Sequence, residues 1–166
     1  MPIGKFTQKL KNERIPRVPG TAVFLTSTLR DVPPFMVWHL TRNRALRRQV
    51  FVLTVSTRSV PWVRPAHRLK FEEIAPDFWR ARARYGFMER PNIPAVLRLA
   101  HARGCNIDLD DVTYYVGHEN VIGARGRTPP WFEALFAFMQ RNSAHVTDYF
   151  GLPPQAVVEI GRQIAI

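Results

Sequence analysis

Hydrophobic and polar positions alternate with two different periods along this 166-residue chain, and together they predict a sheet with helices. Apolar runs at 21–26 and 50–55 are nearly continuous, which is typical of strands that are covered on both faces. Between them, Pro33-Pro34 opens a stretch that we expect to be helical as far as about Leu46, because proline is tolerated in the first turn of a helix. A strand, a helix and a strand in such close succession predict a βαβ crossover with a parallel strand pair.

Strict alternation at 78–85 predicts a half-exposed strand, with a row of arginines on one face and aromatic or small residues on the other. It follows a second extended segment, 67–74, after the turn Ala75-Pro76-Asp77, so the two segments predict a hairpin. Further strands are predicted at 112–116 and from Val158 to the end of the chain.

Helices are predicted where proline begins an apolar stretch. One begins at Pro94 and ends before Gly104, a second follows Thr128-Pro129-Pro130, and a short one spans about 143–150. The predicted fold class is therefore α/β or α+β. We expect a single domain whose mixed β-sheet contains a βαβ crossover and a hairpin and packs against three or four helices.

The first 20 residues differ in character from the rest. Residues 1–20 are polar and basic, with Pro16 and Pro19 as breakers, and this pattern predicts a linker that precedes a domain at 21–166. The chain has no run of 18 or more apolar residues, which is the length that a membrane-spanning helix requires. Its length suits a single domain with a core of its own.

Charge is distributed unevenly along the chain, whose formal net charge is +11. Residues 1–70 hold 14 Lys and Arg against two acids, whereas residues 71–166 hold 10 basic and 11 acidic residues. A strongly basic first half predicts a surface that meets an anionic partner, either the inner leaflet of a membrane or a nucleic acid.

Side chains that could carry catalysis or bind a metal do not form a recognisable pattern. Cys105 and His101 stand four residues apart, but no second pair of ligands at zinc-site spacing accompanies them. Asp108, Asp110 and Asp111 lack the ligand order of a calcium loop, so we expect them to shape a turn and the entry to a strand. The chain is therefore predicted not to be an enzyme.

One loop has the composition of an anion site. The segment Gly123–Thr128 places two guanidinium groups, Arg125 and Arg127, directly before a predicted helix N-terminus, where free N–H groups bind anions. Thr128 completes this candidate anion or nucleotide loop. The following prolines remove two of the useful N–H donors, so an ordinary surface loop is the alternative reading.

Five blocks, in this order along the chain, resemble the cytoplasmic tail of the Kup family (KUP/HAK/KT) of potassium uptake transporters. The most informative block is Arg84-Tyr85-Gly86-Phe87-Met88-Glu89-Arg90-Pro91, because folding alone does not require this order of residues. The others are Arg17–Thr26, Val50–Val55, Asp111–Gly117 and the stretch from Leu135 to Gly161. The resemblance covers about 15–166, almost the whole chain.

The resemblance implies the cytosolic C-terminal domain of a low-affinity potassium:proton symporter, on the cytoplasmic face of the inner membrane. Such a domain is expected to be non-catalytic, to act in dimer contact, carrier stability or regulation of uptake, and to be soluble when isolated. Potassium and protons would be handled by the membrane part, so no cofactor is expected. A nucleotide second messenger is the one small ligand that the resemblance suggests, and the loop with Arg125 and Arg127 is its candidate site.

In this reading the basic start of the chain lies under the membrane, because cytoplasmic segments next to a bilayer are rich in Lys and Arg. The expected membrane-apposed residues are Lys5, Lys9, Lys11, Arg14 and Arg17. The expected partners are the membrane portion of the same transporter, the anionic inner leaflet and a second copy of the chain. The alternative is a free-standing nucleic-acid-binding domain, although the chain contains no recognised nucleic-acid motif.

Overall fold

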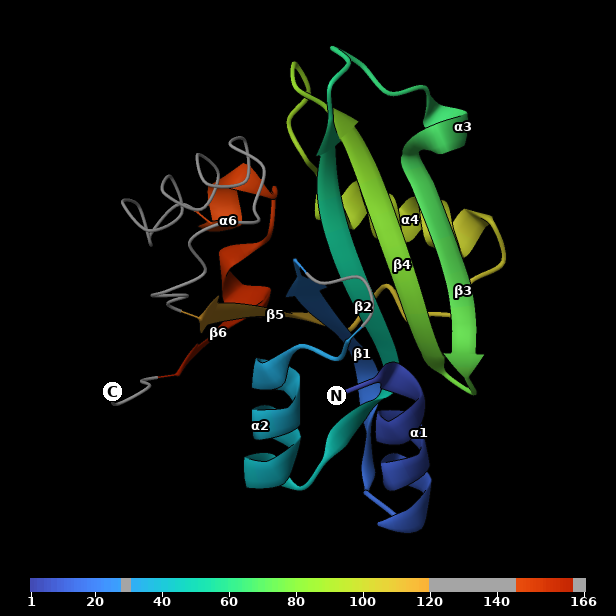
Figure 1. Ribbon diagram of the computed structural model, residues 1–166, viewed down its shortest axis with the longest axis vertical. Coiled ribbons are helices and arrows are strands. Elements are labelled where there is room, and N and C mark those ends of the chain that lie inside the picture. Colours follow the sequence, from blue (N-terminus) through green and yellow to red (C-terminus); the bar gives the residue numbers. More distant parts are fainter. Residues whose placement is uncertain (28–30, 120–145, 163–166) are drawn as a thin grey trace.

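The computed structural model describes residues 1–27, 31–119 and 146–162, which form a mixed sheet with helices on both faces (Figure 1). The strands are β1 (Arg17–Thr26), β2 (Leu46–Arg58), β3 (Leu69–Ala75), β4 (Phe78–Gly86), β5 (Val112–Glu119) and β6 (Val157–Arg162). The helices are α1 (Ile3–Asn12), α2 (Pro34–Asn43), α3 (Pro65–Arg68), α4 (Ile93–Ala102) and α6 (Val146–Tyr149), with a 3-10 turn η1 (Pro154–Ala156). These elements confirm the predicted α/β fold class.

Strand order in the six-stranded sheet is β3-β4-β2-β1-β5-β6. β1 and β2 pair in parallel on either side of α2, so the predicted βαβ crossover is confirmed. β3 and β4 pair antiparallel through the turn at Pro76 and Asp77, so the predicted hairpin is also confirmed. All other strand pairs are parallel, which leaves β3 as the antiparallel edge strand.

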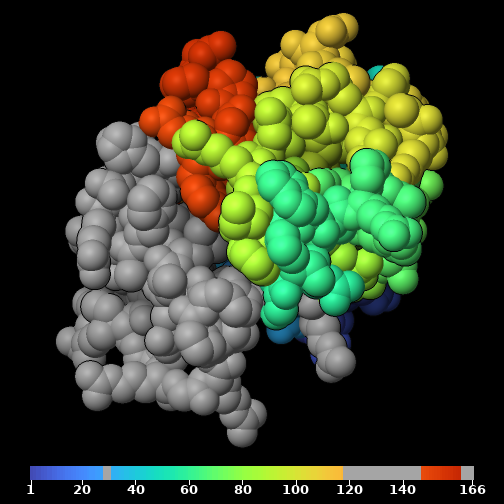
Figure 2. Space-filling view, turned by 90° about the horizontal axis from the view of Figure 1, so that it is seen from above, coloured from blue at the N-terminus to red at the C-terminus, as the bar shows by residue number. Residues whose placement is uncertain are grey.

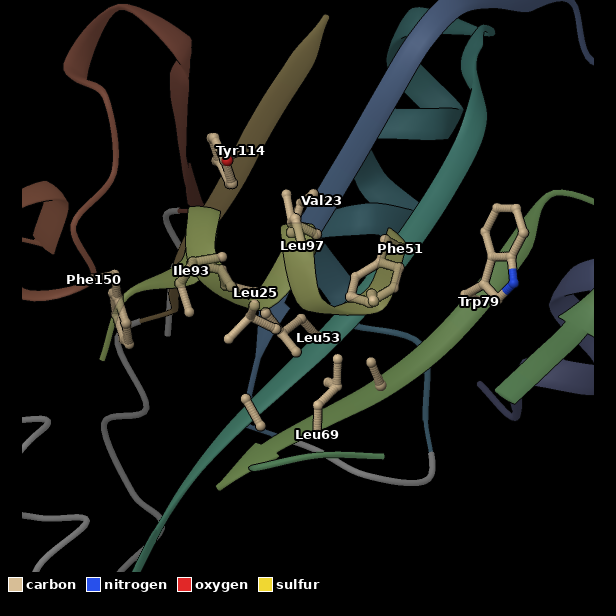
Figure 3. Close-up of a cluster of buried hydrophobic side chains, with 14 of the residues drawn as sticks. Val23, Leu25, Phe51, Leu53, Leu69, Trp79, Ile93, Leu97, Tyr114 and Phe150 are labelled. Atoms are coloured by element: carbon tan, nitrogen blue, oxygen red, sulfur yellow. The ribbon is translucent and has the colours of Figure 1, made fainter. Parts of the chain in front are cut away.

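Two apolar cores cover the two faces of the sheet, as expected for strands with continuous hydrophobic runs. α4 covers one face, where Ile93 and Leu97 pack over Phe51, Leu53 and other strand residues (Figure 3). α1 and α2 lie side by side on the other face (Figure 1). The strand residues beneath these two helices include Phe24, Val50 and Phe78.

Residues 1–20, which the composition predicts to be a linker, form α1 and the start of β1, and residue 20 lies inside β1. α1 begins at Ile3, and its buried residues Ile3, Phe6 and Leu10 recur at a helical spacing of three and four. Their burial against the sheet explains the helix, since a helix of ten residues is marginal without tertiary packing. In the sequence, only these three apolar positions indicated a helix. The nearby helix breakers Pro16 and Pro19 favoured the interpretation as a linker.

α2 begins where predicted but ends at Asn43, three residues before the predicted end. Arg44 adopts a left-handed conformation with φ of 49°, and its N–H donates to the carbonyl of Leu40. This C-cap ends the helix, and β2 begins two residues later at Leu46, which is buried as the first residue of the strand. The helix predicted after Thr128 lies outside the described residues, as does the end of the last predicted strand.

Candidate functional site

The predicted anion loop lies outside the described residues. Arg125, Arg127 and Thr128 all fall in the segment 120–145, and their role stays a prediction.

The five predicted membrane-apposed residues lie on α1 and just after it. Lys5 and Lys11 are exposed on the side of α1 that faces away from the buried Ile3, Phe6 and Leu10. Lys9 forms an exposed ion pair with Glu13, with 3.7 Å between Nζ and Oε1. Arg14 follows the helix in a left-handed conformation, and Arg17 begins β1. Their contact with a membrane stays a prediction.

The structure adds two basic residues to this group, Arg44 at the C-cap of α2 and Arg48 in β2. A groove of about 550 Å³ between the ends of α1 and α2 is lined by Lys9, Glu13 and Arg44 among others. A second groove of about 420 Å³ is lined by Arg17, Arg48 and Asp77 among others. Both grooves lie at the amino-terminal ends of β1 and β2, so we call the residues Lys9, Arg17, Arg44 and Arg48 the basic end. Sequence reasoning found the excess of charge but not this clustering, which depends on the parallel pairing of β1 and β2.

Beside the basic end, Arg47 ties three strands together. Its guanidinium donates to the carbonyl of Pro19 at 2.9 Å, to the carboxylate of Asp111 at 3.0 Å and to the hydroxyl of Thr113 at 3.0 Å. Gly20 lies beneath this cluster with φ of 107°, and a Cβ at that position would lie 2.4 Å from the guanidinium. This junction gives a structural reason for the two motifs that contain Gly20 and Asp111.

At the opposite end of the sheet, Glu89 is the centre of a second polar cluster, which we call the brace. Its carboxylate pairs with Arg68 and accepts the backbone N–H of Gly86 at 2.6 Å and of Val63 at 3.0 Å. Arg68 also lies over the ring of Tyr85, 4.2 Å from its centroid. Both charged side chains are mostly buried, so the brace fixes the chain after β2 to the chain after β4. The octapeptide around Gly86 signalled this site, whereas its partner Arg68 was not found from the sequence.

Acid is expected to weaken the brace. The hydrogen bond from Arg68, helped by the N–H groups of Gly86 and Val63 and opposed by burial, lowers the pKa of Glu89 from 4.5 to about 2. A carboxyl group with a lowered pKa stabilises the fold fully above the unfolded-state pKa, and this contribution is lost progressively as the pH falls from about 5 towards 2. Urea unfolding of the wild type and Glu89→Gln should therefore show a stability difference that is largest near neutral pH and shrinks with acidification. A difference that is independent of pH would contradict this assignment.

Next to the brace, four large apolar side chains lie exposed on two neighbouring loops. Val60 and Trp62, in the loop after β2, are 46% and 66% exposed, and Phe87 and Met88, in the loop after β4, are 58% and 61% exposed. The N–H groups of Phe87 and Met88 donate to the carbonyls of Val60 and Pro61, so the loops run together. We call these four residues the apolar tip. The sequence signal for it was the pair of large apolar residues between Gly86 and Glu89, with no periodic pattern to bury them.

The residues weighed for catalysis or metal binding have structural positions. Burial is the main cause that raises the pKa of the Cys105 thiol to about 12, which makes it a poor nucleophile. The carboxylate of Asp108 accepts the N–H of Asp110, and the backbone carbonyls of Asp108 and Asp111 accept hydrogen bonds from Thr21. These bonds confirm that the aspartates shape the turn before β5. Within the described parts of the chain, no three His, Cys, Asp or Glu side chains are grouped as metal ligands.

Comparison with known proteins finds one matching family, described as K+ potassium transporter C-terminal domain, over residues 19–166. The chain is 56% identical over its whole length to 27% of a protein named probable potassium transport system protein Kup 1 from Bradyrhizobium sp. (strain ORS 278). It is 43% identical, over 99% of its length, to 26% of a Kup 3 protein from Legionella pneumophila (strain Lens). A Kup 1 protein from Geobacter sulfurreducens is 40% identical over the same shares of both chains.

The chain thus spans about a quarter of the length of these curated relatives. No solved structure matches it. Among the helices formed by the described residues, none has the length and apolar character needed to cross a bilayer. The matches support the resemblance seen in the sequence motifs over nearly the same residues.

Proposed function

Because the chain belongs to the family of potassium transporter C-terminal domains, we propose that it is the cytosolic, non-catalytic part of a Kup-type potassium:proton symporter. Its role is to stabilise the carrier or to regulate potassium uptake, and the ion path lies in the membrane portion. In this proposal the domain works at the cytoplasmic face of the cell membrane, next to the membrane portion of the same protein and to a second copy of itself.

The observation that carries a regulatory role is the way in which the chain enters the domain. α1 packs on the sheet from Ile3 onwards, and the carbonyl of Met1 accepts a hydrogen bond from the N–H of Val32. Phe6, fully buried, contacts the ring of Phe78 across a centroid distance of 6.1 Å. A segment that precedes Met1 in a longer protein would therefore lead into a helix that is packed on the sheet, so a movement of that segment would act on α1.

We expect removal of this domain from a full-length Kup transporter to lower potassium uptake severalfold. The test is uptake of a potassium tracer by cells without other potassium uptake systems, divided by the amount of transporter in the membrane. Lower uptake for each transporter supports regulation, and loss of transporter from the membrane supports carrier stability. If uptake and abundance both equal those of the intact protein, the proposed function is wrong.

The basic end supports one alternative, a nucleic-acid-binding domain. Four cations line two grooves and form a surface suited to an anionic ligand. Its affinity for nucleic acid would fall steeply as the salt concentration rises, because binding releases counterions. Titration of the chain with duplex DNA and with RNA across salt concentrations tests this alternative. Binding that Arg44→Gln and Arg48→Gln weaken, together with unchanged uptake on domain removal, would favour it over the transporter role.

A further inference from the structure

The apolar tip has no role in the core, although its backbone is held firmly in place. Among the described residues, eight large apolar side chains are exposed, and half of them lie on these two loops. Figure 2 looks onto this end of the molecule and shows segments 57–68 (green) and 84–91 (lime) side by side. A contiguous apolar patch of this kind on a soluble surface marks an interaction site, whereas single exposed residues need no explanation.

The brace presents the tip in one conformation. Glu89 accepts N–H groups from both loops, and two further backbone bonds join Phe87 to Val60 and Met88 to Pro61. Gly86 permits this close approach, because a Cβ there would lie 2.1 Å from the carbonyl oxygen of Pro61. Because the loop backbone is already ordered, binding costs little backbone entropy, which favours a surface prepared for contact.

The charges around the tip are almost all positive. Segments 57–68 and 84–91 together hold five arginines and one acid, Glu89, which pairs with Arg68. Arg58 and Arg64 are exposed and line one hollow together with Val60 and Trp62. Arg90 is exposed two residues after Met88, and its guanidinium donates to the carbonyl of Asp148 at 3.2 Å. The strand register also places Arg84 opposite Ser56 and Gly86 opposite Arg58 at this end of the sheet. A partner that complements this surface offers an apolar region to the four side chains and negative charges to the arginines around them.

A lipid bilayer fits this description better than a protein does. A standard protein interface engages about 20–30 residues on each side, far more than four side chains on two protruding loops. A bilayer needs only a few apolar side chains below its headgroups, and tryptophan favours that boundary. Arginines attract anionic leaflets and bind phosphate groups through their planar guanidinium.

We propose that the apolar tip docks onto an anionic lipid bilayer, with Trp62, Phe87 and Met88 entering the headgroup region and Arg58, Arg64 and Arg90 binding lipid phosphates. The inference rests on the proposed function only in that a transporter domain works beside a membrane. It also selects an orientation. β2 runs 13 residues from the basic end to the tip, a length of about 40 Å. If the strands stand perpendicular to the bilayer, the tip and the basic end therefore do not contact the same membrane surface.

The test is co-sedimentation of the 166-residue chain with vesicles of phosphatidylcholine alone and of phosphatidylcholine mixed with phosphatidylglycerol. We expect binding to the anionic vesicles, and at least about a tenfold loss of affinity in the double variant Trp62→Ser/Phe87→Ser. Trp38→Ser removes an exposed tryptophan from α2, outside the tip, and should bind like the wild type. Because all three side chains are exposed, the variants should keep the wild-type circular dichroism and unfolding midpoint.

Charge variants separate the two ends of the sheet. Arg58→Gln/Arg64→Gln should weaken binding to anionic vesicles, and Lys9→Gln/Arg44→Gln at the basic end should not. The inference is overturned if the chain binds no vesicles, if the tip variants bind normally, or if only the basic-end variants lose binding. It is equally overturned if sedimentation velocity shows that the tip variants dissolve a dimer, which would make the tip a contact between copies. Since no vesicle result depends on potassium uptake, failure here leaves the test of the proposed function intact.

Discussion

Replacement of Phe6 by alanine is expected to lower the free energy of unfolding by about 3–5 kcal/mol, the range for removal of a buried aromatic ring from a core. Phe6 has no exposed surface and packs with Phe78 and the other residues under α1 and α2. Domains have a total stability of about 5–15 kcal/mol, so this variant should lose a large share of it. Chemical denaturation of the 166-residue chain measures the effect.

The matched control is Gln8→Ala, on the exposed side of the same helix, which should change the stability by less than about 0.5 kcal/mol. A small effect of Phe6→Ala, similar to that of the control, would show that α1 is not part of the cooperative core. In that case the first residues would act as the linker that their composition suggests, and a preceding segment would not act on the sheet through α1.

The second large effect is expected for Glu89→Ala, which should destabilise the domain by about 3–5 kcal/mol. Removal of one partner from a mostly buried ion pair leaves the other charge uncompensated. The N–H groups of Gly86 and Val63 lose their acceptor at the same time. Because these groups hold the two loops together, hydrogen exchange at residues 60–64 and 86–90 should rise more than exchange in α4.

The comparison for this variant is Glu13→Ala, which breaks the exposed ion pair with Lys9 and should change the stability by less than about 1 kcal/mol. A double-mutant cycle with Arg68→Ala isolates the coupling between Glu89 and Arg68. If the two substitutions act additively, the pair contributes no coupling and the brace is held by its backbone hydrogen bonds alone.

These two predictions involve different parts of the proposed domain. Phe6 determines how firmly a preceding segment is joined to the sheet, and Glu89 determines how firmly the apolar tip is presented. A loss of stability at either position also lowers the amount of folded protein in the cell. Uptake measured with Phe6→Ala in a full-length transporter is therefore informative only when the abundance of the variant in the membrane is measured as well.

The amino-acid sequence by itself determined the type and the burial of most elements. Continuous apolar runs predicted β1 and β2, and strict alternation predicted that Trp79 is buried while Arg80 lies on the other face of β4. Proline marked the start of α2 and of α4, and Gly104 marked the end of α4. The order of short motifs was enough to identify the family, because such motifs combine local geometry with residues that folding alone does not require.

Only the tertiary structure decided which distant residues share a surface. Arg68 and Glu89 are 21 positions apart, and Arg47 and Asp111 are 64 apart, yet each pair closes a junction between strands. The burial of α1 likewise depended on a sheet face that its own sequence does not encode. The physical reason is that periodicity reports which side of an element is apolar, whereas strand order and register set what that side meets. The apolar tip follows from the same rule, since its four residues are neighbours only because β2 and β4 run in parallel and end together.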